Sequence, residues 1–421
     1  MTLWYNNSVK IKSIHQVKNL ANKNVLVRAD FNVPIKGGKI LDNYKIKKSL
    51  ATIKFLIEKR AKVILVSHLG RPALPYGGQG GPNGLDKKLS LKPVAIELGK
   101  FLQKTVSLLD VTNLAKHKIK LESLLPGAVV MLENIRFLAG EEANSEKLSK
   151  ELAGLADIFV LDGFAVAHRK SASVCGVVKY LPAYAGLLLE AEIAGLNRAL
   201  KSPRKPLVVV LGGAKIETKM PVLKNLLKTA SYVLLGGGLV NTYLWAKGKK
   251  VGVSLINKNF KKDALRFCGK SKVILPVDVI VGAPDGRFAK AVDVNDLNIP
   301  PPRRGAASEA AKNINLGIFD IGPKTIKLFA RYIKKSQTLV WNGAVGFFEQ
   351  HPYEYGTYSM ARLMAARSRG KAFGIAGGGE TIEVLKKLRL LDDVDLASTG
   401  GGSMLEYLSG NKLPGMQSLM K

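Results

Sequence analysis

Residues 206–219 read PLVVVLGGAKIETK, and this stretch sets the fold of the second half of the chain. The run from Leu207 to Leu211 is short, apolar on both faces and rich in valine, which predicts a buried parallel strand. Gly212 and Gly213 permit a tight turn, and a helical pattern follows. Because a helix N-terminus attracts anions, this turn is a candidate phosphate site, with Lys215 and Lys219 beside it.

The same arrangement recurs three more times, at residues 236–238, 377–379 and 400–402. One glycine-rich turn is a weak signal, since its ordinary interpretation is a plain tight turn. Four of them at strand ends are harder to dismiss, because ligands of open α/β sheets gather there. The chain contains no G-x-x-x-x-G-K-[ST] stretch and no convincing dinucleotide fingerprint.

Other short apolar runs alternate with helical patterns, which predicts an α/β fold with parallel sheets. The strand-like runs lie at 25–28, 61–66, 129–132, 158–161, 232–235, 273–276, 338–341 and 371–376, and helical patterns include 48–59, 145–155 and 221–229. A stretch rich in Ala, Leu and Glu predicts a stiff helix at 185–201. We interpret it as a connector between domains at 1–184 and 202–402, although it could be an ordinary surface helix.

The composition is that of a globular protein: 421 residues, 47% hydrophobic and 23% charged. Two cysteines cannot form a disulfide framework or a four-thiolate zinc site. The chain has no signal-peptide pattern and no apolar run long enough to span a membrane, so we expect a cytoplasmic protein without a membrane partner. The net charge of +33 raises nucleic acid as a partner, but no basic tail or nucleic-acid motif supports a specific one.

The first half places polar and basic side chains just after four strands. Asp30 and Asn32 follow the first strand, and the others are His68, Arg71, Arg136 and Arg169. Any one arginine alone is more simply a surface residue, but three at the same sheet edge would bind a phosphate or carboxylate. Together the two halves suggest a small phosphorylated substrate in one domain and a nucleotide in the other. Phosphoryl transfer between them needs positioning and positive charge more than a base.

Taken together, these motifs show that the chain resembles the phosphoglycerate kinase family along nearly its whole length. The matching blocks are RADFNVP (28–34), SHLGRP (67–72), ENIRF (133–137), AHR (167–169), GGAKIETK (212–219), LLGGGL (234–239), DIGPKT (320–325), WNGAVGFFE (341–349), AGGGET (376–381) and 398–415. The resemblance implies two Rossmann-like domains around a helical hinge, with residues 403–421 packing back on the first. It also implies a phosphotransferase with a carboxyl acceptor, which converts 1,3-bisphosphoglycerate and ADP to 3-phosphoglycerate and ATP in glycolysis, with Mg²⁺ and after hinge closure.

The resemblance also implies roles for individual residues. In the first domain Asp30, Asn32 and His68 would contact the glycerate, and Arg71, Arg136 and Arg169 its 3-phosphate. In the second domain the nucleotide would be bound by Gly213, Ala214, Lys215, Lys219, Gly237, Gly238, Asn342, Glu349, Gly378, Gly379, Glu380 and Thr381. Lys45, Lys215, Gly378 and Gly401 would stabilise charge on the transferring phosphoryl group, and Glu380 would serve Mg²⁺ through the nucleotide. A monomer is also implied.

Five positions depart from the family pattern. Lys45 stands where the family has an arginine, Glu380 where it has an aspartate, and Ala344 where it has a proline. Ala165 replaces a glycine and Ser171 a histidine. Two hypotheses therefore remain open: a working kinase, which we favour because the phosphate-binding arginines and both lysines are retained, and a catalytically weak or inactive paralogue that binds ligand or RNA.

Overall fold

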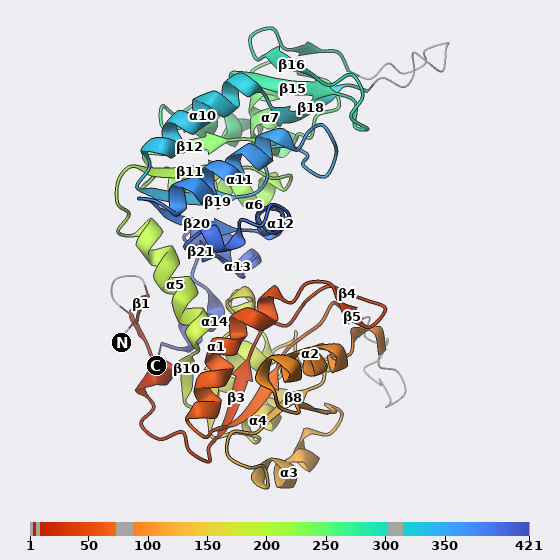
Figure 1. Ribbon diagram of the computed structural model, residues 1–421, viewed down its shortest axis with the longest axis vertical. Helices are drawn as coiled ribbons and strands as arrows, with labels where there is room; N and C mark the ends of the chain where they lie inside the picture. Colours follow the sequence, from red (N-terminus) through yellow and green to blue (C-terminus); the bar gives the residue numbers. More distant parts are fainter. Residues whose placement is uncertain (1–2, 6–8, 73–86, 302–314, 421) are drawn as a thin grey trace. The chain divides into compact units, whose positions relative to one another are not determined.

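The computed structural model describes residues 3–5, 9–72, 87–301 and 315–420. The chain divides into two compact units: unit 1 comprises residues 1–194 and 412–421, and unit 2 comprises residues 195–411. Each unit contains a six-stranded parallel sheet covered by helices (Figure 1). The prediction of two doubly wound α/β domains is therefore confirmed. The domain limits given above and the hinge stay predictions.

The sheet of unit 1 has the strand order β10-β9-β3-β6-β8-β7. Its four inner strands, β9, β3, β6 and β8, are almost wholly buried, which explains their short, continuous apolar runs, whereas the edge strands β7 and β10 are partly exposed. Their bounds are Asn24–Arg28 (β3), Lys62–Val66 (β6), Ser107–Leu109 (β7), Val129–Leu132 (β8), Ile158–Leu161 (β9) and Ala183–Ala185 (β10). Because all six run parallel, the residues that follow β3, β6, β8 and β9 emerge at one edge of the sheet.

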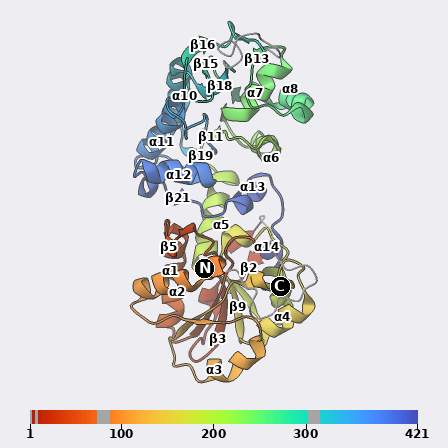
Figure 2. The ribbon, with the colours of Figure 1, turned by 90° about the vertical axis from the view of Figure 1, so that its right-hand side faces the viewer.

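Helices cover both faces of this sheet. Figure 2 shows α1 (Tyr44–Glu58) and α2 (Lys92–Leu102) on one face, with α4 (Glu146–Ala153) on the other. The short α3 (Lys118–Glu122) and α14 (Pro414–Ser418) complete the unit. The last segment is anchored by the Gly415 N–H, which donates to Ala167 O at 2.8 Å.

The sheet of unit 2 has the strand order β14-β12-β11-β19-β20-β21. The strands are Leu207–Leu211 (β11), Tyr232–Leu235 (β12), Val273–Ile274 (β14), Thr338–Asn342 (β19), Phe373–Gly377 (β20) and Leu396–Ala397 (β21). Numbered along the chain, this order is 3-2-1-4-5-6, in which the direction of winding reverses between β11 and β19. Such a reversal opens a crevice at the carboxyl ends of the two strands, where ligands of open α/β sheets bind.

Figure 2 shows α10 and α11 on one side of this sheet and α6 and α7 on the other. Among the described residues, the helices that lie wholly within the unit are Ile216–Leu226 (α6), Gly237–Ala246 (α7), Lys261–Cys268 (α8), Pro323–Lys335 (α10), Tyr355–Ser368 (α11), Gly379–Lys387 (α12) and Gly402–Leu408 (α13). A separate antiparallel sheet, which the sequence analysis missed, pairs Asp278–Gly282 (β15) with Lys290–Asp293 (β16) and Gly317–Ile321 (β18). In the described part of the chain, no helix is long and apolar enough to cross a membrane.

The four predicted glycine turns are confirmed, since each joins a strand of the unit 2 sheet to a helix. The predicted helix at 221–229 was wrong at its start. The helix α6 begins at Ile216 and contains Pro221 in its interior. Proline suits a first turn, where its missing N–H costs nothing, and this preference misled the analysis. The observed start is closer to the turn, so the helix begins directly after Lys215.

The predicted connecting helix is present as α5 (Leu187–Leu200). Its first N–H groups are capped by side chains of unit 1. The Leu187 N–H donates to Thr52 Oγ1 at 2.9 Å, and the Leu188 N–H donates to Asp162 Oδ1 at 3.1 Å. Asp162 is fully buried, and Thr52 donates to its Oδ1 at 2.5 Å. This arrangement ties the start of α5 to the middle of α1 and to the residue that follows β9.

Unit 1 should lose stability as the pH rises because of Asp162. Burial, with a smaller contribution from the charge of Glu190, raises the pKa of Asp162 to about 7. A raised pKa in the folded state gives stability that is complete below pH ~4, the unfolded value, and that disappears as the pH passes the folded value. Between pH 5 and pH 8 we expect the free energy of unfolding of unit 1 to fall by about 2–3 kcal/mol because of Asp162. In Asp162→Asn, hydrogen exchange of β3 and β9 should show a correspondingly flatter pH dependence; equal slopes in both proteins would contradict this.

Candidate functional site

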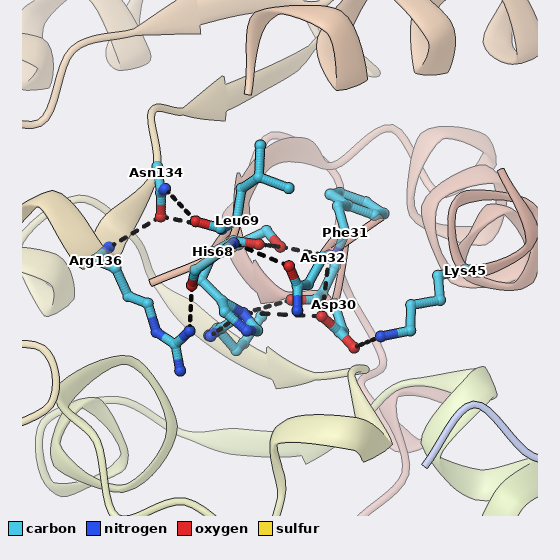
Figure 3. Close-up of polar contacts among 12 residues, drawn as sticks. Asp30, Phe31, Asn32, Lys45, His68, Leu69, Asn134 and Arg136 are labelled. Carbon is cyan, nitrogen blue, oxygen red and sulfur yellow. Dashed lines mark hydrogen bonds and ion pairs between the residues drawn. The ribbon is translucent and has the colours of Figure 1, made fainter. Parts of the chain in front are cut away.

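The carboxyl edge of the unit 1 sheet carries a buried acid between two basic groups. Asp30, which follows β3, accepts a hydrogen bond from Lys45 Nζ of α1 at 2.6 Å (Figure 3). His68 Nδ1, after β6, lies 3.8 Å from Asp30 Oδ1. Burial alone would raise the pKa of Asp30, but the charge of Lys45 and its hydrogen bond outweigh this and lower it. Asp30 is therefore an anion at neutral pH, held by the lysine that departs from the family pattern.

Asparagine side chains connect the loops around this acid. Asn134, after β8, accepts from the Leu69 N–H at 3.1 Å and from the Arg136 N–H at 3.2 Å, and it donates to Leu69 O at 2.8 Å. Asn32 accepts from the Gly70 N–H at 2.9 Å. Figure 3 shows how these bonds bring the ends of three strands together. Asn134 lies inside the ENIRF block, but the sequence analysis gave it no role.

Arg28, the last residue of β3, is a second buried residue at this edge to which the sequence analysis gave no role. Only 1% of it is exposed. Its Nε donates to Ser173 Oγ at 2.7 Å, its Nη2 lies 3.3 Å from His68 Nδ1, and Glu141 lies 4.0 Å away. Burial, followed by the charge of Arg28, lowers the pKa of His68 well below its usual range. His68 is therefore neutral at pH 7.

Next to Arg28 is a basic cavity of about 280 Å³. Its lining includes Arg136, Arg169, Lys170 and Ser171, with Glu141 and Glu142. Arg136 is buried and pairs with Glu142 at 3.1 Å. Two buried donor atoms, Arg169 Nε and Ser171 Oγ, have no hydrogen-bond partner within the described residues. A bound oxyanion would satisfy such donors.

The three arginines expected to hold a phosphate influence one another electrostatically. Burial and then the charge of Arg169 lower the pKa of Arg136, and Arg71 adds a smaller effect in the same direction. Arg71 itself is exposed. Asp30, His68, Arg71, Arg136 and Arg169 thus lie at one sheet edge, as the sequence analysis expected of strand ends. Their contact with a ligand stays a prediction.

Unit 2 contains a cavity of about 340 Å³ at the crevice between β11 and β19. It is lined by glycines and apolar side chains, with a few polar groups. Six of the residues expected to bind nucleotide line it: Gly213, Ala214, Gly237, Gly238, Glu349 and Glu380. Apolar walls with few polar groups are typical of sites for small-molecule ligands. Asp320 and Phe347 also line the cavity, and the sequence analysis gave them no role.

Main-chain hydrogen bonds fix the glycine turns at this cavity. The Gly213 N–H donates to Ala344 O at 2.6 Å, and the Gly237 N–H donates to Val345 O at 3.0 Å. Gly213 has φ +99°, a conformation that other residues rarely adopt. The segment 343–345, directly after β19, thus holds two of the four turns in place.

Polar side chains converge on Asn342 and on this segment. Lys219 is buried and donates to Asn342 Oδ1, while Asn342 Nδ2 donates to Gly377 O at 2.8 Å. The Gly343 N–H donates to Thr381 Oγ1 at 2.8 Å. Burial lowers the pKa of Lys219 to about 8, although Glu380 acts to raise it. Burial disfavours the charged form of Lys219, and a bound anion would favour that form again.

The remaining expected residues of unit 2 do not line the cavity. Lys215 is exposed at the start of α6. Gly378 has φ +98° and lies beside Asn342, and Gly379 begins α12. Gly401 precedes α13, and a Cβ there would meet open space. Glu349, which does line the cavity, has a raised pKa because of partial burial and the charges of Glu380 and Glu383.

The donors around this cavity fit Mg²⁺ only together with a phosphate ligand. Within residues 3–5, 9–72, 87–301 and 315–420, no three His, Cys, Asp or Glu side chains gather as a metal site. Mg²⁺ is usually held by one or two carboxylates plus phosphate oxygens and water. Glu380 offers one carboxylate at the cavity wall, close to Gly213 and Lys219. One carboxylate beside the Gly213 turn suits a metal ion that arrives with a phosphorylated ligand.

Comparisons with known proteins point to one family. The family model described as phosphoglycerate kinase matches residues 14–411. A phosphoglycerate kinase of Francisella tularensis subsp. tularensis (strain WY96-3418) is 39% identical over 408 residues, which cover 95% of this chain and 96% of the relative. That of Borreliella afzelii (strain PKo) is 38% identical, covering 98% and 100%.

Solved structures agree with the sequence matches. The phosphoglycerate kinase of Coxiella burnetii aligns with a TM-score of 0.81 and 37% identity, covering 97% of this chain and 98% of that one. The enzyme of Pyrococcus horikoshii OT3 aligns with a TM-score of 0.79 and 30% identity, with the same coverage. The similarity therefore extends over both units.

Proposed function

The chain belongs to the phosphoglycerate kinase family, and from this premise we propose how its residues transfer a phosphoryl group between 1,3-bisphosphoglycerate and ADP. The observation that supports the proposal is that, in both units, anion-binding groups gather at the carboxyl ends of parallel strands. Unit 1 binds the phosphoglycerate, and unit 2 binds the nucleotide.

In unit 1 the basic cavity takes the 3-phosphate of the substrate. Arg136 and Arg169 line it, and Arg71 adds positive charge at its edge. The unpartnered Arg169 Nε and Ser171 Oγ supply further donors to phosphate oxygens. Asp30, Asn32 and His68 contact the hydroxyl and carboxyl end. Because His68 is neutral, it can accept or donate a hydrogen bond there but contributes no charge.

In unit 2 the base lies against Gly237 and Gly238, and the phosphates lie on the turn of Gly213, Ala214 and Lys215. Asn342 and Lys219 contact the phosphate chain, and Glu349 the ribose. Gly378, Gly379, Thr381 and Gly401 supply or orient main-chain N–H groups toward developing charge. Mg²⁺ is proposed to bind through the nucleotide and Glu380, where it would neutralise phosphate charge.

The reaction needs no general base. In the direction of ATP formation the nucleophile is an oxygen of ADP that is already ionised, and in reverse it is a carboxylate. The chemical task is to hold two polyanions in line and to offset their repulsion, which positive side chains and oriented N–H groups achieve. Lys45 and Lys215 are proposed to supply positive charge nearest the transferring group. Closure about a hinge, expected from the sequence, stays a prediction.

Lys45→Arg should raise kcat by about threefold to tenfold. Lysine keeps the charge of the family's arginine but lacks its planar fork, which binds phosphoryl oxygens through two parallel bonds. A gain of about one hydrogen bond in the transition state corresponds to this factor. A coupled assay with saturating substrates measures it, with Lys48→Arg on the exposed side of α1 as the matched control. An unchanged or lower kcat would show that lysine is already the better residue here.

The same assay, with 3-phosphoglycerate and Mg-ATP, tests the proposed function. We expect turnover well above a blank without enzyme. The alternative of an inactive ligand- or RNA-binding paralogue is not favoured, since relatives matching 95% or more of the chain carry the kinase name. Absence of turnover in a protein that binds both substrates would revive it. Filter binding of generic RNA at physiological salt is the second readout.

We also propose that the protein acts as a monomer in the cytoplasm, with small-molecule substrates and no specific nucleic-acid partner. Sedimentation of the purified protein at micromolar concentration tests the monomer. Sedimentation as a dimer would overturn it without affecting the residue assignments.

A further inference from the structure

Ala344 and Glu380 are joined by a hydrogen bond at the wall of the unit 2 cavity. The Ala344 N–H donates to Glu380 Oε2 at 3.1 Å, although the two residues lie 36 positions apart. Both residues line the cavity. Ala344 is largely buried, so its N–H gains from a hydrogen-bond partner in the protein. Glu380 provides that partner.

The bond connects two parts of the proposed phosphate site. Through its carbonyl oxygen Ala344 accepts from the Gly213 N–H, and through its own N–H it holds Glu380. Glu380 Oε2 also lies 3.2 Å from the point where a Cβ on Gly213 would stand. One residue therefore fixes both the glycine turn and the carboxylate beside it.

These two positions are among the five that depart from the family pattern. A proline at 344 would have no N–H to donate, and an aspartate at 380 would be one methylene shorter. The longer side chain and the additional donor occur together in this chain and contact each other. The contact gives a physical reason why the two departures accompany one another.

We propose that Ala344 is a positioning residue whose N–H orients the Glu380 carboxylate toward the cation that accompanies the nucleotide phosphates, so that residues 344 and 380 work only as a matched pair. The inference rests on the proposed function of the cavity. A glutamate has one more rotatable bond than an aspartate, and the N–H restricts that freedom. With Oε2 held, the carboxylate keeps one oxygen for the cation, in a fixed position.

The test is a double-mutant cycle, which compares the natural chain with Ala344→Pro, Glu380→Asp and the double variant. Calorimetric titration gives the Kd of ADP with Mg²⁺ and, separately, with EDTA. We expect each single change to weaken Mg-ADP binding about fivefold to tenfold and metal-free ADP binding less than twofold. The double variant should return to within about twofold of the natural chain. A merely structural role would affect both titrations equally.

Two further variants keep the test decisive if Ala344→Pro does not fold. Glu380→Asp leaves the backbone unchanged and should speed hydrogen exchange of the Ala344 amide as well as weaken Mg-ADP binding. Glu383→Asp makes the same change one turn further along α12, on an exposed residue, and should do neither.

Several results would overturn the inference. One is a double variant whose fold-loss in affinity for Mg-ADP equals the product of the fold-losses in the two single variants. Another is Glu380→Asp with unchanged exchange at Ala344 or with the same loss in EDTA. Failure of the natural chain to bind ADP at all would instead refute the proposed function of the cavity, and the inference with it.

Discussion

Lys215→Ala should lower kcat about 10³-fold, while the Kd of ADP should change only severalfold. Lys215 stands at the glycine turn after β11, one residue before α6 begins. In the proposed function, a cation at this point would stabilise charge that develops on the transferring phosphoryl group, and removing such a group typically costs between two and five orders of magnitude. The effect falls on kcat because the interaction is strongest in the transition state. The coupled assay and ADP titration measure the two constants.

Since Lys215 is exposed, its removal should leave the folded state intact, within about 0.5 kcal/mol. Lys228→Ala, also exposed and also in unit 2, is the matched control for loss of one positive charge and should retain full activity. Retention of a tenth or more of kcat in Lys215→Ala would exclude a major role in transfer.

Arg28→Met should destabilise unit 1 by about 3–5 kcal/mol. The guanidinium is buried with Ser173, His68 and Glu141, and Glu141 in turn accepts from the Ser173 N–H at 2.9 Å and from Ser173 Oγ at 2.7 Å. Removing one member of a buried ion pair leaves the other charge without compensation, and this unpaired charge is the main cost. Hydrogen exchange of β3 and β6 reports the loss, and exchange of β11 should not change.

The double variant Arg28→Met/Glu141→Gln separates charge from packing. Glutamine keeps an oxygen for the Ser173 N–H but carries no charge, so about half of the lost stability should return. If Arg28→Met alone costs less than about 1 kcal/mol, the buried pair contributes little and water compensates Glu141.

The sequence predicts most of the fold because the main signals are local. The run 207–211 and its equivalents are apolar on both faces, and each glycine turn lies directly after its strand. The side chains that follow the strands were found for the same reason. The antiparallel sheet of β15, β16 and β18 was missed, since its strands are separated along the chain and β16 carries exposed and half-buried residues.

Contacts between distant residues could not be predicted from a single sequence. Arg28 ends a strand, a position where an arginine normally reaches water, and nothing nearby reveals that Ser173 and Glu141 enclose it. The bond between Ala344 and Glu380 likewise depends on how β19 and β20 pair. The sequence analysis recognised Lys45 as a departure from the family pattern. Its hydrogen bond to Asp30 could be seen only once the fold was known.

The glycine turns of unit 2 are secured by atoms that every residue possesses. Gly213 and Gly237 donate to the carbonyl oxygens of Ala344 and Val345, and these bonds do not depend on which side chains stand at 344 and 345. Substitutions at 344 and 345 that keep the backbone in place therefore preserve these two bonds, whereas a proline at 344 would remove the N–H that holds Glu380. Turns held in this way tolerate side-chain substitutions in the neighbouring segment. Such substitutions allow new contacts, and the contact between residues 344 and 380 is an example.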